Sequence, residues 1–162
     1  PAEWIPIAGS LEAIAMLNHS GYRVAVATNQ SGIARGLFDM AALNAIHDKM
    51  HRALSQLGGR IDALFYCPHA ADDHCDCRKP KTGMIEDISR RFSIELNQVY
   101  AVGDALRDLQ AFAHAGCKPI LVRTGKGEET LAQGNLPPNT LVMADLAEAA
   151  QHIISEQTIL AK

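Results

Sequence analysis

The stretch Tyr22-Arg-Val-Ala-Val-Ala-Thr28, followed directly by Asn29-Gln-Ser-Gly32, decides the fold that we predict for this chain. It is a nearly continuous apolar run that ends in polar residues, which is typical of a buried parallel strand. Open α/β sheets bind their ligands at the carboxyl ends of such strands. A hydroxyl and successive backbone N–H groups at this point can hold a phosphate, although similar turns are common without a ligand. The candidate binding residues are Thr28, Asn29, Gln30 and Ser31.

Helix and strand patterns alternate on both sides of this stretch. Before it, Ser10 is a candidate N-cap of a helix that ends near Gly21. After it, Asp39 is a candidate cap of a helix whose buried face includes Leu54 and Leu57. The later patterns predict strands over 63–66, 99–102, 120–122 and 141–143, and helices over 82–92, up to Gly116, over 128–133 and after Asp145. This alternation predicts one α/β domain over residues 1–162, three-layered and Rossmann-like, with helices on both faces of a parallel sheet.

The composition excludes several classes of protein. The chain has 162 residues, of which 48% are hydrophobic and 20% charged, and its net charge of -3 leaves no broad basic face. We therefore expect neither a nucleic-acid partner nor a membrane partner. No apolar run reaches the ~18 residues of a membrane span, and the first residues show no signal-peptide pattern. Cysteines gathered in one short segment fit a reducing compartment, so a cytoplasmic location is expected.

Three of the four cysteines lie in one short segment, Cys67-Pro-His69 and Cys75-Asp-Cys77. Thiolate and imidazole ligands clustered in this way are typical of a tetrahedral zinc site. Cys67, His69, Cys75 and Cys77 fill four positions and leave none for water, so the predicted site is structural. His74 directly precedes Cys75, which makes it the poorer alternative to His69. The alternative for the whole segment is a set of thiols without metal.

Two cations, Arg78 and Lys79, directly follow the cysteine segment. Adjacent cations at such a place can bind an anionic substrate. We expect the metal to brace the segment so that both side chains meet a phosphate. Arg78 and Lys79 are therefore candidate substrate-binding residues.

A second constellation is Gly103-Asp104-Ala-Leu-Arg-Asp108, at the end of a predicted strand. Two carboxylates one helical turn apart can hold a hard cation such as Mg²⁺, Asp104 directly and Asp108 in support. The alternative is an ordinary acidic helix N-terminus, and this motif alone does not decide between the two. The later loop Thr124-Gly-Lys-Gly127 matches no Walker-type motif, and we interpret it as a turn.

Two histidines and one cysteine outside these motifs have ordinary interpretations. His47 and His51 lie one turn apart on a predicted helix, but no third ligand is near in sequence, so we interpret them as surface residues. Cys117 follows a helix-ending glycine and begins a strand, which predicts a buried thiol.

The motifs, taken in this order, resemble the haloacid dehalogenase (HAD) superfamily of phosphatases. Thr28 matches the second motif of that superfamily, Lys79 the third, and Gly103-Asp104-x-x-x-Asp108 the fourth. The cysteine segment with Arg78-Lys79-Pro80 is similar to a zinc-containing branch of heptose-bisphosphate and histidinol-phosphate phosphatases. The stretch Ser31-Gly-Ile-Ala-Arg35 favours the heptose-bisphosphate members, because histidinol-phosphate members usually carry Asp-Gly-Leu-Gly there.

This resemblance implies a Mg²⁺-dependent hydrolase that removes the 7-phosphate of D-glycero-D-manno-heptose 1,7-bisphosphate through an aspartyl-phosphate intermediate, in lipopolysaccharide-core biosynthesis. It implies that Thr28 and Lys79 stabilise the phosphoryl group and that Asp104, supported by Asp108, binds Mg²⁺. The expected partner is a small phosphorylated sugar, and the expected state is a monomer. A histidinol-phosphate phosphatase is the alternative within the family.

One part of the family pattern is absent from these residues. The first motif, Asp-x-Asp-Gly-Val, supplies the nucleophile and the general acid/base, and no Asp-x-Asp occurs in the chain. We therefore expect that about twenty-five further residues, including the first central strand, precede Pro1 in the natural protein. The 162 residues alone are expected to be inactive. The alternative of another class is a catalytically inactive binding module stapled by zinc.

Overall fold

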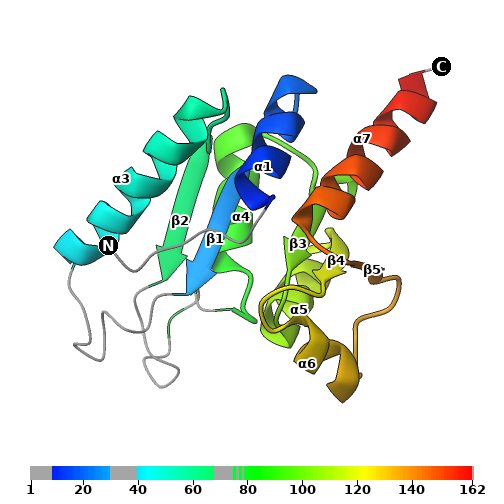
Figure 1. Cartoon of the computed structure of the whole chain (residues 1–162). Helices are drawn as coiled ribbons and strands as arrows, with labels where there is room; N and C mark the ends of the chain where they lie inside the picture. Colours follow the sequence, from blue (N-terminus) through cyan, green and yellow to red (C-terminus); the bar gives the residue numbers. More distant parts are fainter. Residues whose placement is uncertain (1–8, 30–39, 68–74, 76, 78, 162) are drawn as a thin grey trace. The chain divides into compact units, whose positions relative to one another are not determined.

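The structure is a computed structural model of the chain, and it describes residues 9–29, 40–67, 75, 77 and 79–161 (Figure 1). The chain divides into two compact units, Pro1–Cys75 and Asp76–Lys162, which are described separately. Several residues of interest lie outside the described ranges, namely Gln30, Ser31, Asp39, His69, His74 and Arg78.

The first unit contains a pair of parallel strands and two helices. Helix α1 spans Ser10–His19, strand β1 Ala25–Asn29, helix α3 Met40–Gln56 and strand β2 Ala63–Cys67. The register of the strand pair runs from Ala25 opposite Ala63 to Asn29 opposite Cys67. Because the strands are parallel, their carboxyl ends leave the sheet at the same edge (Figure 1).

Helix α1 does not begin as predicted, because Ser10 is already its first helical residue. The flanking position is Gly9, whose φ of 83° lies in the left-handed region that glycine adopts without a steric cost. The helix start has no side-chain capping hydrogen bond, so the assignment of Ser10 as the N-cap is wrong. The predicted end of the helix is confirmed: Gly21 has a φ of 92° and donates its N–H to the carbonyl of Asn18.

The buried face predicted for α3 is correct at Leu54 and wrong at Leu57. Leu54 is fully buried, whereas Leu57 is 39% exposed. The helix ends at Gln56, and the chain turns at Gly58 with a φ of 74°. Leu57 therefore falls outside the helical repeat that would have carried it to the core.

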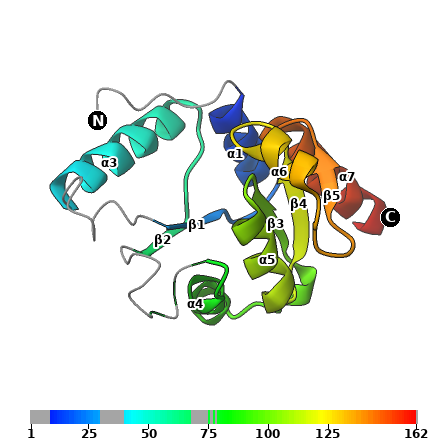
Figure 2. The same cartoon turned by 90° about the horizontal axis from the view of Figure 1, so that it is seen from below.

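The second unit is a three-stranded parallel sheet with helices. Its elements are α4 Gly83–Phe92, the 3₁₀ turn η1 Leu96–Gln98, β3 Tyr100–Gly103, α5 Leu106–Ala115, β4 Lys118–Val122, α6 Gly127–Gln133, β5 Leu141–Met143 and α7 Leu146–Ala161. The strands are ordered β3-β4-β5 and both pairs are parallel. Figure 2 shows α5 and α7 on opposite sides of these strands.

The core of the second unit forms between α4, α5 and the strands. Its buried members are Ile85, Leu109, Ala111, Phe112, Cys117 and Leu121. Cys117 is 7% exposed, which confirms the prediction of a buried thiol. Both units alternate helices with parallel strands, and the predicted α/β, Rossmann-like class is confirmed. In the part of the chain that is described, none of the helices is long and apolar enough to cross a bilayer.

Candidate active site

The polar turn predicted to bind phosphate begins at the carboxyl end of β1. Thr28 pairs with Tyr66 and Asn29 with Cys67 across the parallel ladder. The turn therefore leaves the sheet beside the start of the cysteine segment. Thr28 is half-buried, and the remainder of the turn continues beyond the described residues.

The cysteine segment brings three thiols together. Cys67 is fully buried at the end of β2, and its Sγ lies 3.4 Å from the Sγ of Cys75. With Cys77, the three sulfurs all lie within 4.8 Å of one another, and none is in a disulfide. Three soft ligands at this separation fit a zinc ion, which needs a fourth ligand to complete a tetrahedron. The fourth residue of the predicted set, His69, lies outside the described residues.

Lys79 and Asp108 form a buried ion pair in the second unit. The Nζ of Lys79 lies 2.6 Å from the Oδ1 of Asp108, and the two side chains are 9% and 10% exposed. The other carboxylate oxygen, Oδ2, accepts the backbone N–H of Ala105 at 3.2 Å. Asp108 thus caps the start of α5 and fixes the lysine. A buried charge needs this kind of partner, because an unpaired one costs several kcal/mol.

The close approach of Asp108 to the sheet requires a glycine at the end of β3. A Cβ built on Gly103 would lie 2.6 Å from the Cβ of Asp108, a distance that real side chains do not adopt. The glycine of the Gly-Asp pair therefore has a packing role. It lets the carboxylate reach the Ala105 amide and the lysine at the same time.

Asp104 lies directly after β3 and is held by a loop that comes much later in the chain. Its Oδ2 accepts the backbone N–H of Lys126 at 2.9 Å, and its backbone carbonyl accepts the hydroxyl of Thr130 at 2.7 Å. Gly125, with a φ of 59°, lies against the same carboxylate. Among the described residues, Oδ1 of Asp104 has no hydrogen-bond partner, so it is the oxygen suited to a cation.

The sequence does not indicate that Gly125, Lys126 and Thr130 contact Asp104, because their loop matches no known motif. The one available signal was position: the loop follows β4, and Asp104 follows the neighbouring β3. The carboxyl ends of adjacent parallel strands lie at one edge, so their loops meet.

Two titratable groups outside the motifs have perturbed pKa values. Burial raises the pKa of the Cys117 thiol to about 11, which keeps it protonated and unsuited to metal binding. Burial lowers the pKa of His47, the neighbouring His51 lowers it further, and Asp48 opposes both. Among the described residues, neither histidine belongs to the group of three gathered thiols.

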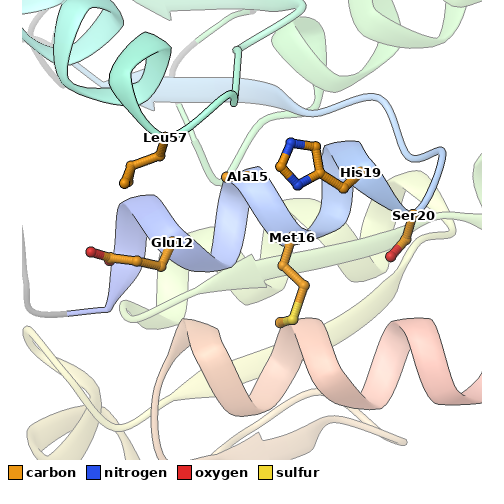
Figure 3. A pocket seen from close by; sticks show the side chains of 6 residues that line it. All are labelled: Glu12, Ala15, Met16, His19, Ser20 and Leu57. Atoms are coloured by element: carbon orange, nitrogen blue, oxygen red, sulfur yellow. The ribbon is translucent and has the colours of Figure 1, made fainter.

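The first unit also has a hollow of about 320 Å³ beside α1 (Figure 3). It is lined by Glu12, Ala15, Met16, His19, Ser20 and Leu57. The Nε2 of His19 lies 3.1 Å from the carbonyl of Gly58 beside it. None of the predicted site residues lines this hollow, so the candidate active site lies elsewhere.

Comparisons with known proteins give the class and then the family. The family described as HAD-hydrolase-like matches residues 76–149, the part that contains Lys79, Asp104 and Asp108. The fold and these residues define the class as a HAD-like hydrolase. D-glycero-β-D-manno-heptose-1,7-bisphosphate 7-phosphatase of Bordetella bronchiseptica is 61% identical over 96% of this chain and 87% of that protein. The protein of the same name in Neisseria meningitidis serogroup B is 51% identical over 96% and 84%.

A solved structure agrees with these relatives. The crystal structure of D,D-heptose 1,7-bisphosphate phosphatase from B. bronchiseptica, complexed with magnesium and phosphate, matches with a TM-score of 0.95. The match is 61% identical and covers 96% of this chain and 87% of that one. The chain belongs to the family of D-glycero-β-D-manno-heptose-1,7-bisphosphate 7-phosphatases.

Proposed function

We propose that the chain forms most of a Mg²⁺-dependent phosphatase that removes the 7-phosphate of D-glycero-β-D-manno-heptose 1,7-bisphosphate. The observation that carries the proposal is the buried ion pair of Lys79 with Asp108, 2.6 Å apart. Asp108 lies in the first turn of α5, which begins just after Asp104. A fixed cation beside a metal-binding carboxylate is what phosphoryl transfer needs. The 61% identity to a relative named for this reaction supports the substrate.

Each predicted site residue has a place in this proposal. Thr28 and the N–H of Asn29 hold phosphoryl oxygens, and Gln30 and Ser31 complete the same turn. Lys79 neutralises a phosphoryl oxygen, so that a carboxylate nucleophile can approach the dianion. Asp104 holds Mg²⁺ through Oδ1, while Asp108 supports it by fixing the lysine and the helix start. When bound, Mg²⁺ supplies further charge neutralisation at the phosphate.

The nucleophile and the general acid/base come from an Asp-x-Asp segment ahead of Pro1, within the same domain. The absence of that motif from the 162 residues supports this part of the proposal. N-terminal sequencing and the intact mass of the natural protein test it. A natural protein without an Asp-x-Asp segment would contradict it and would favour an inactive, zinc-stapled binding module.

The zinc site, the location and the assembly state are further parts of the proposal. Cys67, His69, Cys75 and Cys77 hold a structural zinc, which three gathered thiols support. The enzyme acts as a monomer in the cytoplasm, where reduced thiols persist. Its product enters the synthesis of the nucleotide-activated heptose of the lipopolysaccharide core.

Phosphate release by the natural protein in Mg²⁺ tests the function directly. We expect release from the heptose bisphosphate and little from histidinol phosphate. The 162-residue chain serves as the control and should release none from either. Faster release from histidinol phosphate would identify that compound as the substrate instead. No release from either compound would contradict an enzymatic role.

Arg78 gives a prediction about substrate recognition. As the neighbour of Lys79 in a segment braced by zinc, it binds the phosphate that is not transferred. Arg78→Ala should therefore raise KM for the bisphosphate by about tenfold and change KM for a sugar monophosphate far less. Steady-state kinetics with both substrates measure this, and equal effects on both would contradict the assignment.

A further inference from the structure

We infer that the segment from Arg123 to Thr130, which follows β4 and includes the first turn of α6, positions the Mg²⁺ ligand Asp104. This inference rests on the proposed function, since it assigns what keeps one carboxylate ready for the metal. It concerns residues that belong to none of the motifs predicted from the sequence.

Two hydrogen bonds fix Asp104 from opposite ends of the residue. The Lys126 backbone N–H donates to the carboxylate Oδ2 at 2.9 Å, and the Thr130 hydroxyl donates to the backbone carbonyl at 2.7 Å. The first bond fixes the side-chain torsion and leaves Oδ1 for a cation. The second fixes the backbone from which the side chain projects. Together they hold the carboxylate in one orientation, which lowers the entropy lost when a cation binds.

Steric contact with Gly125 makes the orientation depend on a glycine. A Cβ at this position would lie 2.3 Å from Oδ2 of Asp104. Any side chain must therefore displace the carboxylate or the loop. The φ of 59° adds the usual preference for glycine.

The segment is itself closed by further contacts. Gly127 donates its N–H to the carbonyl of Thr124, and Thr130 donates its N–H to the carbonyl of Lys126, both at 2.9 Å. Arg123 forms an ion pair with Glu128 at 2.7 Å across the start of α6. Thr130 is 5% exposed, so water competes little for its hydroxyl. These contacts fix the shape of the loop, and the loop in turn fixes the position of Asp104.

The test uses Thr130→Val in the natural protein, with the Mg²⁺ dissociation constant measured by calorimetry on the metal alone. We expect binding to weaken about fivefold, as befits the loss of one positioning hydrogen bond. The apparent Mg²⁺ requirement in the phosphatase assay should rise equally, while KM for the substrate at saturating Mg²⁺ stays within about twofold. Thr130→Ser restores the hydroxyl and should restore the wild-type constant.

Thr140→Val is the matched control. The Thr140 hydroxyl also donates to a backbone carbonyl at 2.7 Å, that of Pro137, and this bond lies in the same unit without touching Asp104. It should cost similar stability and leave Mg²⁺ binding unchanged. Equal weakening by both valine variants would overturn the inference, because the effect would then be general destabilisation. Wild-type Mg²⁺ affinity in Thr130→Val would overturn it as well.

Gly125→Ala provides a second test should Thr130→Val fold poorly. Its control is Gly116→Ala, because Gly116 is also left-handed, with a φ of 92°, but has no atom within 4 Å of the added Cβ. We expect Gly125→Ala to weaken Mg²⁺ binding by about tenfold or more and Gly116→Ala to leave it unchanged. Equal constants for both alanine variants would overturn the inference. A wild-type protein that neither binds Mg²⁺ nor releases phosphate would instead refute the proposed function.

Discussion

Asp108 illustrates how a single carboxylate can serve structure and site together. One oxygen accepts the Ala105 amide and the other pairs with Lys79, both out of contact with most water. Such a pair does not add much stability over an apolar one, but breaking it is costly. The pair is therefore better understood as fixing the lysine than as strengthening the fold.

This pair gives the first stability prediction. Lys79→Met removes the cation from the buried Asp108 charge, so the free energy of unfolding should fall by about 3 kcal/mol. Arg90→Met is the control, since Arg90 pairs with Asp87 on the surface and should cost under about 1 kcal/mol. Urea unfolding of both variants measures the difference. If both variants lost similar free energies of unfolding, water would reach Lys79 and Asp108 as freely as it reaches the surface pair, and the prediction would be wrong.

Asp62 gives a pH prediction within the first unit. Burial by itself would raise its pKa, but the Val24 N–H at 2.8 Å and the Arg60 guanidinium outweigh it, so the pKa lies below the ordinary 3.8. A depressed pKa contributes stability above the unfolded value, and this stability is lost as the pH falls through the folded value. The stability advantage of the wild type over Asp62→Asn should be constant above about pH 5 and shrink below about pH 4. Unfolding curves across this range measure it, and an advantage that does not shrink would contradict the lowered pKa.

Among the secondary-structure elements, helices α7 and α1 differ in whether a side chain caps their first turn. Helix α7 begins with a true cap: Asp145 Oδ1 accepts the N–H of Glu148 at 2.9 Å. At the start of helix α1 the flanking residue is instead Gly9, and Ser10 is already the first helical residue. The two residue types are equally good caps in general, so only the backbone geometry distinguishes them.

This contrast predicts two different alanine effects. Asp145→Ala should lower the free energy of unfolding by about 1 kcal/mol, because the Glu148 N–H in the first turn of α7 loses its acceptor. Ser10→Ala should stay within about 0.5 kcal/mol of the wild type. Thermal or urea unfolding measures both, and a larger effect for Ser10→Ala would contradict the assignment of Gly9 as the flanking residue.

For the molecule as a whole, the cysteine segment lies where the chain passes from the first unit into the second. We expect zinc removal to affect the segment and its cations before it affects Asp104, which is held within the second unit. In a thiol titration at about pH 8, chelation should expose the three gathered thiols, while Cys117, with a pKa of about 11, reacts only on unfolding. KM should rise and the Mg²⁺ dissociation constant should not. An unchanged KM after zinc loss would contradict the bracing role.

Much of this molecule could be predicted from short-range patterns. The apolar run before Thr28, the glycine ends of α1 and α5, and the gathering of three thiols depend on neighbouring residues. The order of the strands predicts that the two loops meet, but not the individual contacts of Asp104, because Lys126 lies 22 residues later and donates a backbone N–H that nearly any residue possesses. The requirement for glycine at position 103 could not be predicted either, because it depends on the position of the Asp108 side chain in the folded protein.

The register of β1 against β2 has a consequence for how this protein can change in evolution. Asn29 lies opposite Cys67, so the turn proposed to bind phosphate and the first thiol leave adjacent strands at one level. A substitution can damage either of them alone. A one-residue insertion within β2 would turn Cys67 to the opposite face and shift its level against the turn, and so would change the alignment of the two. Functional relatives of this protein should therefore keep the length of β2, whereas substitutions at its less buried positions should be tolerated.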